Sequence, residues 1–193
     1  MKIVSVQGDI VKFRGDAIVN AANVAMLGGG GVDGAIQRAA GPQLKAWIRA
    51  NVPIIEHDIR LRTGDATITD GFNLRAKYII HTVGPMFHDS ATVRDVAYGG
   101  EIMERASLKD IPPRDLLKKS IRSCLEVADA NDIKTLAIPA ISCGVFGGTV
   151  SLFAKVLAEV AAEKEWGVTK LWVVLFQDWE MEEFRQVWDF VKK

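Results

Sequence analysis

The sequence is poor in cysteine, has no excess of charge of either sign and contains no long apolar run. Its 193 residues include only 2 cysteines, which excludes a small fold held together by disulfides. The 24 Lys and Arg residues balance 24 Asp and Glu residues, so no net charge attracts a nucleic-acid backbone, and nucleic acid is not expected as a partner. No stretch reaches the roughly 18 apolar residues that a spanning helix needs, so no membrane partner is expected either.

The two cysteines and the first residues exclude further classes. Cys124 and Cys143 lie far apart, with neither CxxC spacing nor a histidine cluster beside them, so we expect reduced thiols and no metal site. Cys124 falls on the apolar face of a helical pattern and is expected in the core. Residues 1–7 lack the apolar stretch and cleavage site of a signal peptide, which predicts a cytoplasmic protein. Nothing in the sequence indicates a bound cofactor.

Length and composition fit a single domain over residues 1–193. A chain of this length can bury roughly 70% of its extended-chain surface, enough for a sizeable core. Short apolar runs alternate with helix-period segments, which is the α/β pattern, and several runs are apolar throughout, as in strands covered on both faces. We therefore expect a three-layer helix–sheet–helix sandwich around a central mixed, mostly parallel sheet of about six strands.

The element boundaries follow from the apolar runs and their spacing. The expected strands are the short apolar runs at residues 2–6, 17–20, 61–67, 78–83, 135–141 and 171–176. Helices are expected where apolar residues recur at spacings of three and four, at residues 33–40, 43–50, 117–128, 152–160 and 184–191. Residues 88–113 are mostly polar and punctuated by glycine and proline, which predicts an insertion. It is either a lid near the ligand site or a surface excursion without a chemical role.

Three loops carry residues that suit a phosphate-containing ligand. In an open α/β sheet, ligands bind beyond the carboxyl ends of the strands. The loops are residues 7–10, residues 20–34 with four successive glycines, and residues 141–148. Glycines before a helix let consecutive N–H groups turn toward phosphate oxygens, so the two glycine-rich loops could hold a diphosphate without Lys or Arg. Flexible turns alone are the alternative for both loops.

Gly29, Gly31 and Gly34 also satisfy the G-x-G-x-x-G dinucleotide motif. In a Rossmann fold those glycines follow the first strand directly, and an acidic residue comes about 20 residues later. Here the first strand leads to Gly8 and Asp9, and the glycines follow an asparagine-rich loop. Their position argues against a Rossmann oxidoreductase.

Six ordered motifs together resemble a macrodomain, the ADP-ribose-binding module. They are GDI at residues 8–10, DAIVNAAN at 16–23, GGGGVDGAI at 28–36, AAGP at 39–42, IIHTVGP at 79–85 and the loop at 139–147. The GGGGVDG form further resembles the branch that includes hydrolases of mono-ADP-ribosylated proteins and of O-acetyl-ADP-ribose. The resemblance implies ADP-ribose binding and hydrolysis of ADP-ribose esters. The alternative is a reader module that binds ADP-ribose without turnover.

The resemblance also implies roles at the adenine end of the ligand. Asp9 is expected to accept a hydrogen bond from the adenine amine, and the backbone N–H of Ile10 to bind the ring; the alternative for Asp9 is a turn cap. Phe176 resembles the aromatic residue that packs on adenine, and its alternative is an ordinary core position.

At the other end, the resemblance implies that two loops bind the diphosphate and the distal ribose. The expected binding residues there are Asn23, Gly30, Gly31, Val32, Ser142, Cys143, Gly144, Val145 and Phe146. Asn23, Asp33 and Gln37 are the expected catalytic residues; the alternative for Asp33 is a helix N-cap. The hydrolase branch usually has histidine where this chain has Gln37, and glutamine cannot exchange a proton near neutral pH. Asn20 is expected to hold the loop together, and His81 to be a core histidine.

Overall fold

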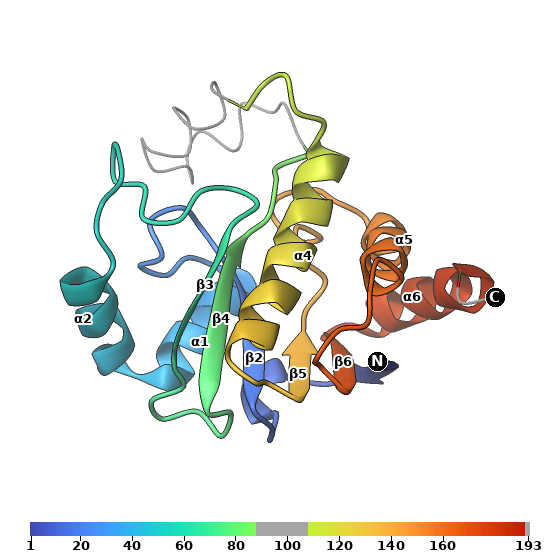
Figure 1. Ribbon diagram of the computed structural model, residues 1–193, viewed down its shortest axis with the longest axis horizontal. Helices are drawn as coiled ribbons and strands as arrows, with labels where there is room; N and C mark the ends of the chain where they lie inside the picture. The colour runs from blue at the N-terminus through green and yellow to red at the C-terminus, as the bar shows by residue number, and fades with distance from the viewer. Residues whose placement is uncertain (88–107, 192–193) are drawn as a thin grey trace.

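The computed structural model describes residues 1–87 and 108–191 and is built around one six-stranded sheet (Figure 1). The strand order is β1-β6-β5-β2-β4-β3. The strands are β1 (Lys2–Gln7), β2 (Ala17–Ala22), β3 (Ala66–Asp70), β4 (Tyr78–Val83), β5 (Thr135–Ile138) and β6 (Lys170–Leu175). Every neighbouring pair is parallel except β3 with β4, which is antiparallel, so the predicted mixed, mostly parallel sheet is confirmed.

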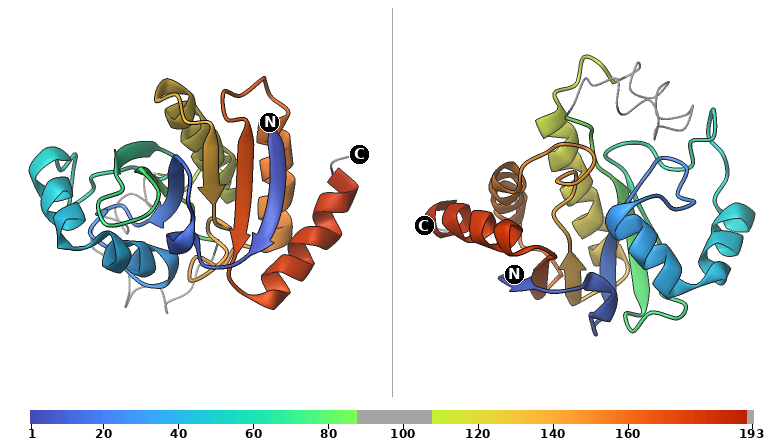
Figure 2. Two further views of the ribbon diagram at one scale, coloured as in Figure 1. Left: turned by 90° about the horizontal axis from the view of Figure 1, so that it is seen from below. Right: turned by 180° about the vertical axis from the view of Figure 1, so that it is seen from behind.

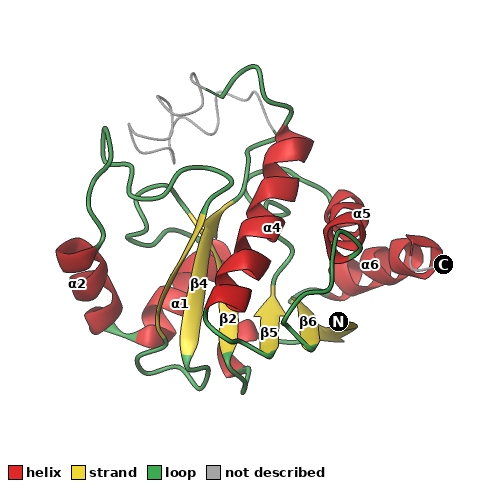
Figure 3. Cartoon of the chain, viewed as in Figure 1, coloured by secondary structure: helices red, strands yellow, loops and turns green. Residues whose placement is uncertain are grey.

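Helices cover both faces of this sheet (Figures 2 and 3). The helices are α1 (Gly31–Ala40), α2 (Pro42–Asn51), α4 (Pro113–Ala130), α5 (Val150–Ala161) and α6 (Asp178–Val191), with a short 3-10 turn η1 (Ile10–Lys12). Alternation along β2 shows the two layers: Ile18 packs with α1 and α2, whereas Val19 packs with α4 and α5. The predicted three-layer sandwich is therefore confirmed.

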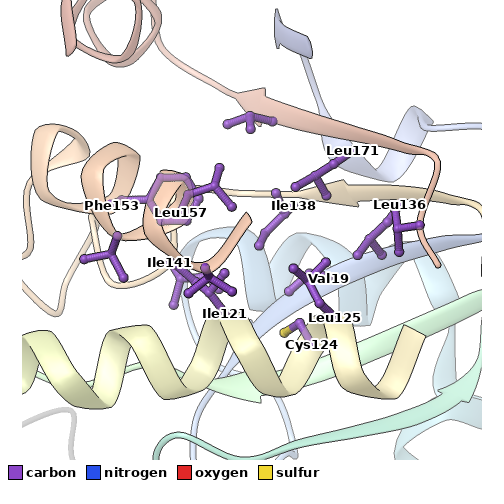
Figure 4. Packing of buried hydrophobic residues seen from close by; sticks show 14 of the residues in the cluster. Val19, Ile121, Cys124, Leu125, Leu136, Ile138, Ile141, Phe153, Leu157 and Leu171 are labelled. Carbon is purple, nitrogen blue, oxygen red and sulfur yellow. The ribbon is translucent and has the colours of Figure 1, made fainter. Parts of the chain in front are cut away.

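The larger of the two core clusters lies between the sheet and α4, α5 and α6 (Figure 4). Ile121 and Leu125 of α4 and Phe153 of α5 are fully buried there against strand residues such as Leu136. Cys124 belongs to this cluster, as predicted, and burial raises the pKa of its thiol to about 12. Both cysteines are unpaired, so Cys124 acts as a small apolar side chain.

Two strands, β3 and β5, have a boundary three or more residues from the predicted one. The strand expected at residues 61–67 instead begins at Ala66, because residues 62–65 form a turn in which Gly64 has a φ of +92°, a left-handed conformation that glycine adopts without strain. The strand expected at residues 135–141 ends at Ile138, because Pro139 has no N–H to donate to a neighbouring strand. β5 therefore ends three residues earlier than predicted.

Most of the predicted insertion, residues 88–107, lies outside the described residues. At its described end, α4 begins with Pro113, whose fixed φ suits the first turn of a helix. Among the helices described, none is both long and apolar enough to cross a membrane.

Candidate functional site

A cavity of about 220 Å³ lies at the carboxyl ends of the central parallel strands. Its walls are residues 21–23 and 29–33 after β2, Gly84 and Met86 after β4, and residues 140, 142 and 144–146 after β5. Because β5, β2 and β4 are neighbours in the sheet, their loops meet at one edge. The two glycine-rich loops of the sequence thus form opposite parts of one site.

The cavity brings together most of the predicted ligand residues. Those that line it are Asn23, Gly30, Gly31, Val32, Asp33, Ser142, Gly144, Val145 and Phe146. The predicted residues that do not line it are Asp9, Ile10, Gln37, Cys143 and Phe176. Gly84 and Met86 were missed, although a signal existed: they directly follow a strand that is buried from Ile79 onward, where a loop of a parallel sheet is placed for binding.

Asn23 is held by its own loop. Its Oδ1 accepts a hydrogen bond from the Met26 N–H at 3.0 Å, and its Nδ2 donates to the Gly28 carbonyl at 3.2 Å. These bonds close the turn between β2 and the glycine run, where Met26 has a φ of +59°. One N–H of the Asn23 amide is therefore used inside the loop. Because Asn23 lines the cavity, its other N–H is placed to bind a ligand.

Asp33 is a buried carboxylate at the cavity wall. Only 4% of the residue is exposed, its Oδ1 accepts from Asn20 Nδ2 at 2.8 Å, and its Oδ2 has no partner in the described part of the chain. Burial raises the pKa of Asp33, against the lowering effects of the Asn20 hydrogen bond, the nearby Gln37 amide and the Lys45 charge. The N-cap of α1 is Gly30, so the alternative interpretation of Asp33 as the cap is wrong.

Close approach explains the glycine at residue 34. A Cβ on Gly34 would lie 2.5 Å from the Gly29 carbonyl oxygen, which is closer than real Cβ contacts come, whereas a Cβ on Gly29 would be in ordinary contact at 3.4 Å from Asn23 Nδ2 and Asp33 Oδ2. Within the run, Gly28 and Gly31 have φ of +91° and +55°, a left-handed conformation that glycine adopts without strain. The loop and α1 therefore pack too tightly for a side chain at Gly34, which flexible turns alone would not require.

The second glycine-rich loop is closed by its own backbone. The Gly148 N–H donates to the Ser142 carbonyl at 2.8 Å, and the Phe87 N–H donates to the Phe146 carbonyl at 2.7 Å. Ser142 has a φ of +67°, and its buried Oγ has no partner among the described residues. Burial, with help from nearby glutamates, raises the pKa of the Cys143 thiol to about 12, so it is not a nucleophile near neutral pH.

Two predicted adenine-binding residues lie at the ends of β1 and β6. Asp9 Oδ1 accepts from the Val11 N–H at 3.2 Å and caps η1, so the turn-cap role is present. Phe176 is 66% exposed just beyond the end of β6, which excludes a core position. Its N–H donates to Glu180 Oε2 at 2.7 Å instead of extending the sheet, and the strand therefore ends one residue earlier than predicted.

Gln37 and His81 are both buried outside the cavity wall. Gln37 Nε2 donates to the Met26 carbonyl at 3.2 Å, so it supports the loop that also holds Asn23. His81 is fully buried and contacts Thr69 and Asn20, which confirms the predicted core histidine. Burial lowers the pKa of His81 to about 3, and the ring is neutral near neutral pH.

Comparison with known proteins identifies the family. The family model described as Macro domain matches residues 19–157. This chain belongs to the macro domain family. A macro domain-containing protein of Vibrio parahaemolyticus is 40% identical over 184 residues, covering 95% of this chain and 92% of that protein. A Salmonella gallinarum protein named O-acetyl-ADP-ribose deacetylase is 45% identical over 142 residues, covering 74% of this chain and 67% of that protein.

Solved structures carry the same fold. The Oceanobacillus iheyensis macrodomain with ADP is 30% identical to this macro domain, with a TM-score of 0.80, and the match covers 98% of this chain and 91% of that one. The Trypanosoma brucei macrodomain in complex with ADP-ribose is 28% identical, with a TM-score of 0.73, covering 95% and 68%.

The chemistry of the site follows from its lining. Within residues 1–87 and 108–191, no group of three His, Cys, Asp or Glu side chains could hold a metal ion. The glycine-rich wall of this macro domain presents backbone groups, one amide and one buried carboxylate. Such a lining suits a ligand with phosphate oxygens next to hydroxyl groups.

Proposed function

We propose that this macro domain binds ADP-ribose and hydrolyses ADP-ribose esters, either mono-ADP-ribosylated acidic side chains or O-acetyl-ADP-ribose. The observation that carries the proposal is Asp33, a buried carboxylate whose second oxygen is unpartnered among the described residues and which lines the glycine-walled cavity. A relative named O-acetyl-ADP-ribose deacetylase and a neighbouring structure in complex with ADP-ribose support it. The reader alternative has no comparable support.

Binding uses neutral donors. In the proposal, backbone N–H groups at residues 30–32, 142 and 144–146 hold the diphosphate, since the start of α1 presents its dipole there. Phe146, Asn23 and Asp33 contact the distal ribose, while Asp9, Ile10 and Phe176 contact adenine. Because no Lys or Arg within residues 1–87 and 108–191 lines the cavity, these residues hold the anion by geometry, which suits a chain without net charge.

Hydrolysis uses the free oxygen of Asp33. In the proposal, Asp33 Oδ2 accepts a proton as a water adds to the ester, and the ester bond to the ribose breaks. Asp33 then returns this proton to the ribose oxygen, which leaves as a hydroxyl, and the other product is a carboxylic acid. Cys143 does not act as a nucleophile, since its thiol stays protonated. Gln37 contributes by supporting the Met26 turn, and a direct contact of Gln37 with the ligand stays a prediction.

The test of the function is release of ADP-ribose. We expect the chain to release ADP-ribose from a glutamate-modified protein or acetate from O-acetyl-ADP-ribose, well above the uncatalysed background. Free ADP-ribose should raise the melting temperature, because a ligand that binds only the folded state stabilises it, and AMP should bind far more weakly. If the chain binds ADP-ribose tightly but releases neither product, it is a reader module. Equal affinity for AMP and ADP-ribose would refute the diphosphate site.

A pair of variants separates the two roles of Asp9. In Asp9→Asn the amide oxygen can still cap η1, but an N–H group replaces the acceptor for the adenine amine. We expect both Asp9→Asn and Asp9→Ala to weaken ADP-ribose binding by about 1–3 kcal/mol. Only Asp9→Ala should also lose about 0.5–2 kcal/mol of stability with the cap. Calorimetry and thermal unfolding measure both quantities, and wild-type affinity in Asp9→Asn would make Asp9 a cap alone.

A further inference from the structure

A row of buried polar side chains crosses the sheet from its antiparallel edge to Asp33. Thr69 lies on β3, His81 on β4 and Asn20 on β2, and Asp33 follows on α1; each is at most 4% exposed. Asn20 and His81 are directly paired in the register of β2 and β4, so both side chains lie on the sheet face that α1 covers. Thr69 is diagonal to His81 on the same face.

One assignment of the protons satisfies every contact in this row of side chains. The Thr69 hydroxyl donates its one proton to the Asp70 carbonyl at 3.1 Å, and its oxygen, 3.0 Å from His81 Nε2, then accepts from that ring nitrogen. A neutral imidazole with its proton on Nε2 has an acceptor at Nδ1. Asn20 Nδ2 donates one N–H to His81 Nδ1 at 3.2 Å and the other to Asp33 Oδ1 at 2.8 Å.

This pattern determines the orientation of the Asn20 amide. Asn20 Oδ1 has no partner among the described residues, so the two acceptors facing Nδ2 set the orientation. A rotated amide would direct its oxygen at the Asp33 carboxylate and at His81 Nδ1, which are both acceptors. His81 therefore blocks the rotated state, and Asn20 holds one oxygen of Asp33, a residue that lines the cavity.

We propose that His81 is a positioning residue for ester hydrolysis, which acts through Asn20 to hold the Asp33 carboxylate in place. The proposal rests on the proposed function, because it assigns His81 to the reaction at Asp33. His81 touches no ligand, since it does not line the cavity. A buried imidazole needs partners for both ring nitrogens in any role, so the assignment rests on what those partners do: Thr69 sets the tautomer, and Asn20 links the ring to Asp33.

Other groups also act on Asp33 and must stay constant in a test. They are Gln37 on its own helix and Lys45 on α2, whose charge favours the ionised carboxylate. His81 on β4 contributes no charge near neutral pH, since burial lowers its pKa to about 3. The Asn20 contact should therefore be the same at every pH at which the enzyme is assayed.

The test compares three replacements of His81. His81→Leu removes both ring contacts, and His81→Gln can still donate near Thr69 but has no acceptor near Asn20. His81→Asn places an amide oxygen near the former Nδ1 position and should restore the Asn20 contact. We expect kcat to fall about tenfold in the Leu and Gln variants and to stay near wild type in His81→Asn, with KM and ADP-ribose affinity within about twofold.

The pH profile separates positioning from mere structural support. Loosening the Asn20 donor raises the pKa of Asp33, so the acid limb of kcat should move up by about one pH unit in His81→Leu. Ser120→Ala is the matched control. Ser120 is a buried polar residue that does not belong to the row from Thr69 to Asp33, and its hydroxyl donates to the Val83 and Leu116 carbonyls. The substitution should lower the melting temperature without moving the acid limb. An unmoved limb in His81→Leu, or equal rates in His81→Asn and His81→Leu, overturns the proposal.

Nuclear magnetic resonance keeps this result separate from that of the proposed function. We expect the ¹⁵N shifts of His81 in the wild-type chain to report the Nε2–H tautomer between about pH 5 and 8. The carboxyl ¹³C titration of Asp33 should shift upward in His81→Leu, with or without turnover. A wild-type chain that hydrolyses no ester refutes the proposed function, whereas an Nδ1–H tautomer refutes the positioning role even in an active enzyme.

Discussion

Replacing Asp33 by asparagine or alanine is expected to cut ester hydrolysis at least ~100-fold, the low end of the effect of a positioned acid–base group. The reason is Asp33 Oδ2, which has no partner among the described residues and which, in the proposal, accepts the proton of the attacking water. Asp33→Asn is the sharper variant, because its amide oxygen can still accept from Asn20 while its N–H₂ group cannot take a proton. ADP-ribose affinity should fall far less than the rate. Single-turnover release and calorimetry measure the two effects.

The same substitution changes the pH dependence of stability. Burial raises the pKa of Asp33 above its unfolded value, so the folded state holds this proton more tightly. The resulting stabilisation is fully present below the unfolded pKa and is lost as the pH rises through the folded pKa. Asp33→Asn lacks this contribution, so the difference in melting temperature between the two proteins should vary with pH in that direction. If the difference in melting temperature is the same at every pH and Asp33→Asn turns over at the wild-type rate, another group accepts the proton.

The sequence predicted the parts of the site that follow from local pattern. The apolar strands β2 and β4, the glycine run and the carboxylate at the start of α1 are all visible in neighbouring residues, and their spacing carried the family resemblance. Asp33 was predicted to face the site from the family resemblance, through its place in the GGGGVDG motif. Its alternative role as a cap failed because Gly30 occupies the N-cap position.

Other contacts depend on strand order and register, which no local pattern contains. The pairing of Asn20 with His81 needs β2 beside β4 in one register, and the Thr69 contact needs β3 to return antiparallel on the outer side. Lys45 acts on Asp33 only because α2 folds back beside α1. The exposure of Phe176 depends on Glu180, whose carboxylate binds the N–H groups at the end of β6.

Gly34→Ala is expected to destabilise the fold and weaken ADP-ribose binding, although helix propensity alone predicts the opposite. Alanine inside a helix is favoured over glycine by about 1 kcal/mol. Against this gain, the new Cβ would lie 2.5 Å from the Gly29 carbonyl oxygen, a backbone atom that cannot swing away as a side chain can. Overpacking of this kind costs about 1–3 kcal/mol, so we expect a net loss.

Gly34→Ala should also change the ligand site, because the clash is relieved only if Gly29 or α1 moves. Gly29 lies between Asn23 Nδ2 and Asp33 Oδ2, and all three residues line the cavity. We expect ADP-ribose affinity to fall at least ~10-fold, since displaced backbone donors and ribose contacts act together. Gly8→Ala is the control for stability alone, because a Cβ there meets nothing within 4 Å, while Gly8 belongs to the loop at residues 7–10 that was predicted to bind the ligand. A raised melting temperature with intact affinity in Gly34→Ala would show that the loop yields freely, and the glycines would then be flexible turns.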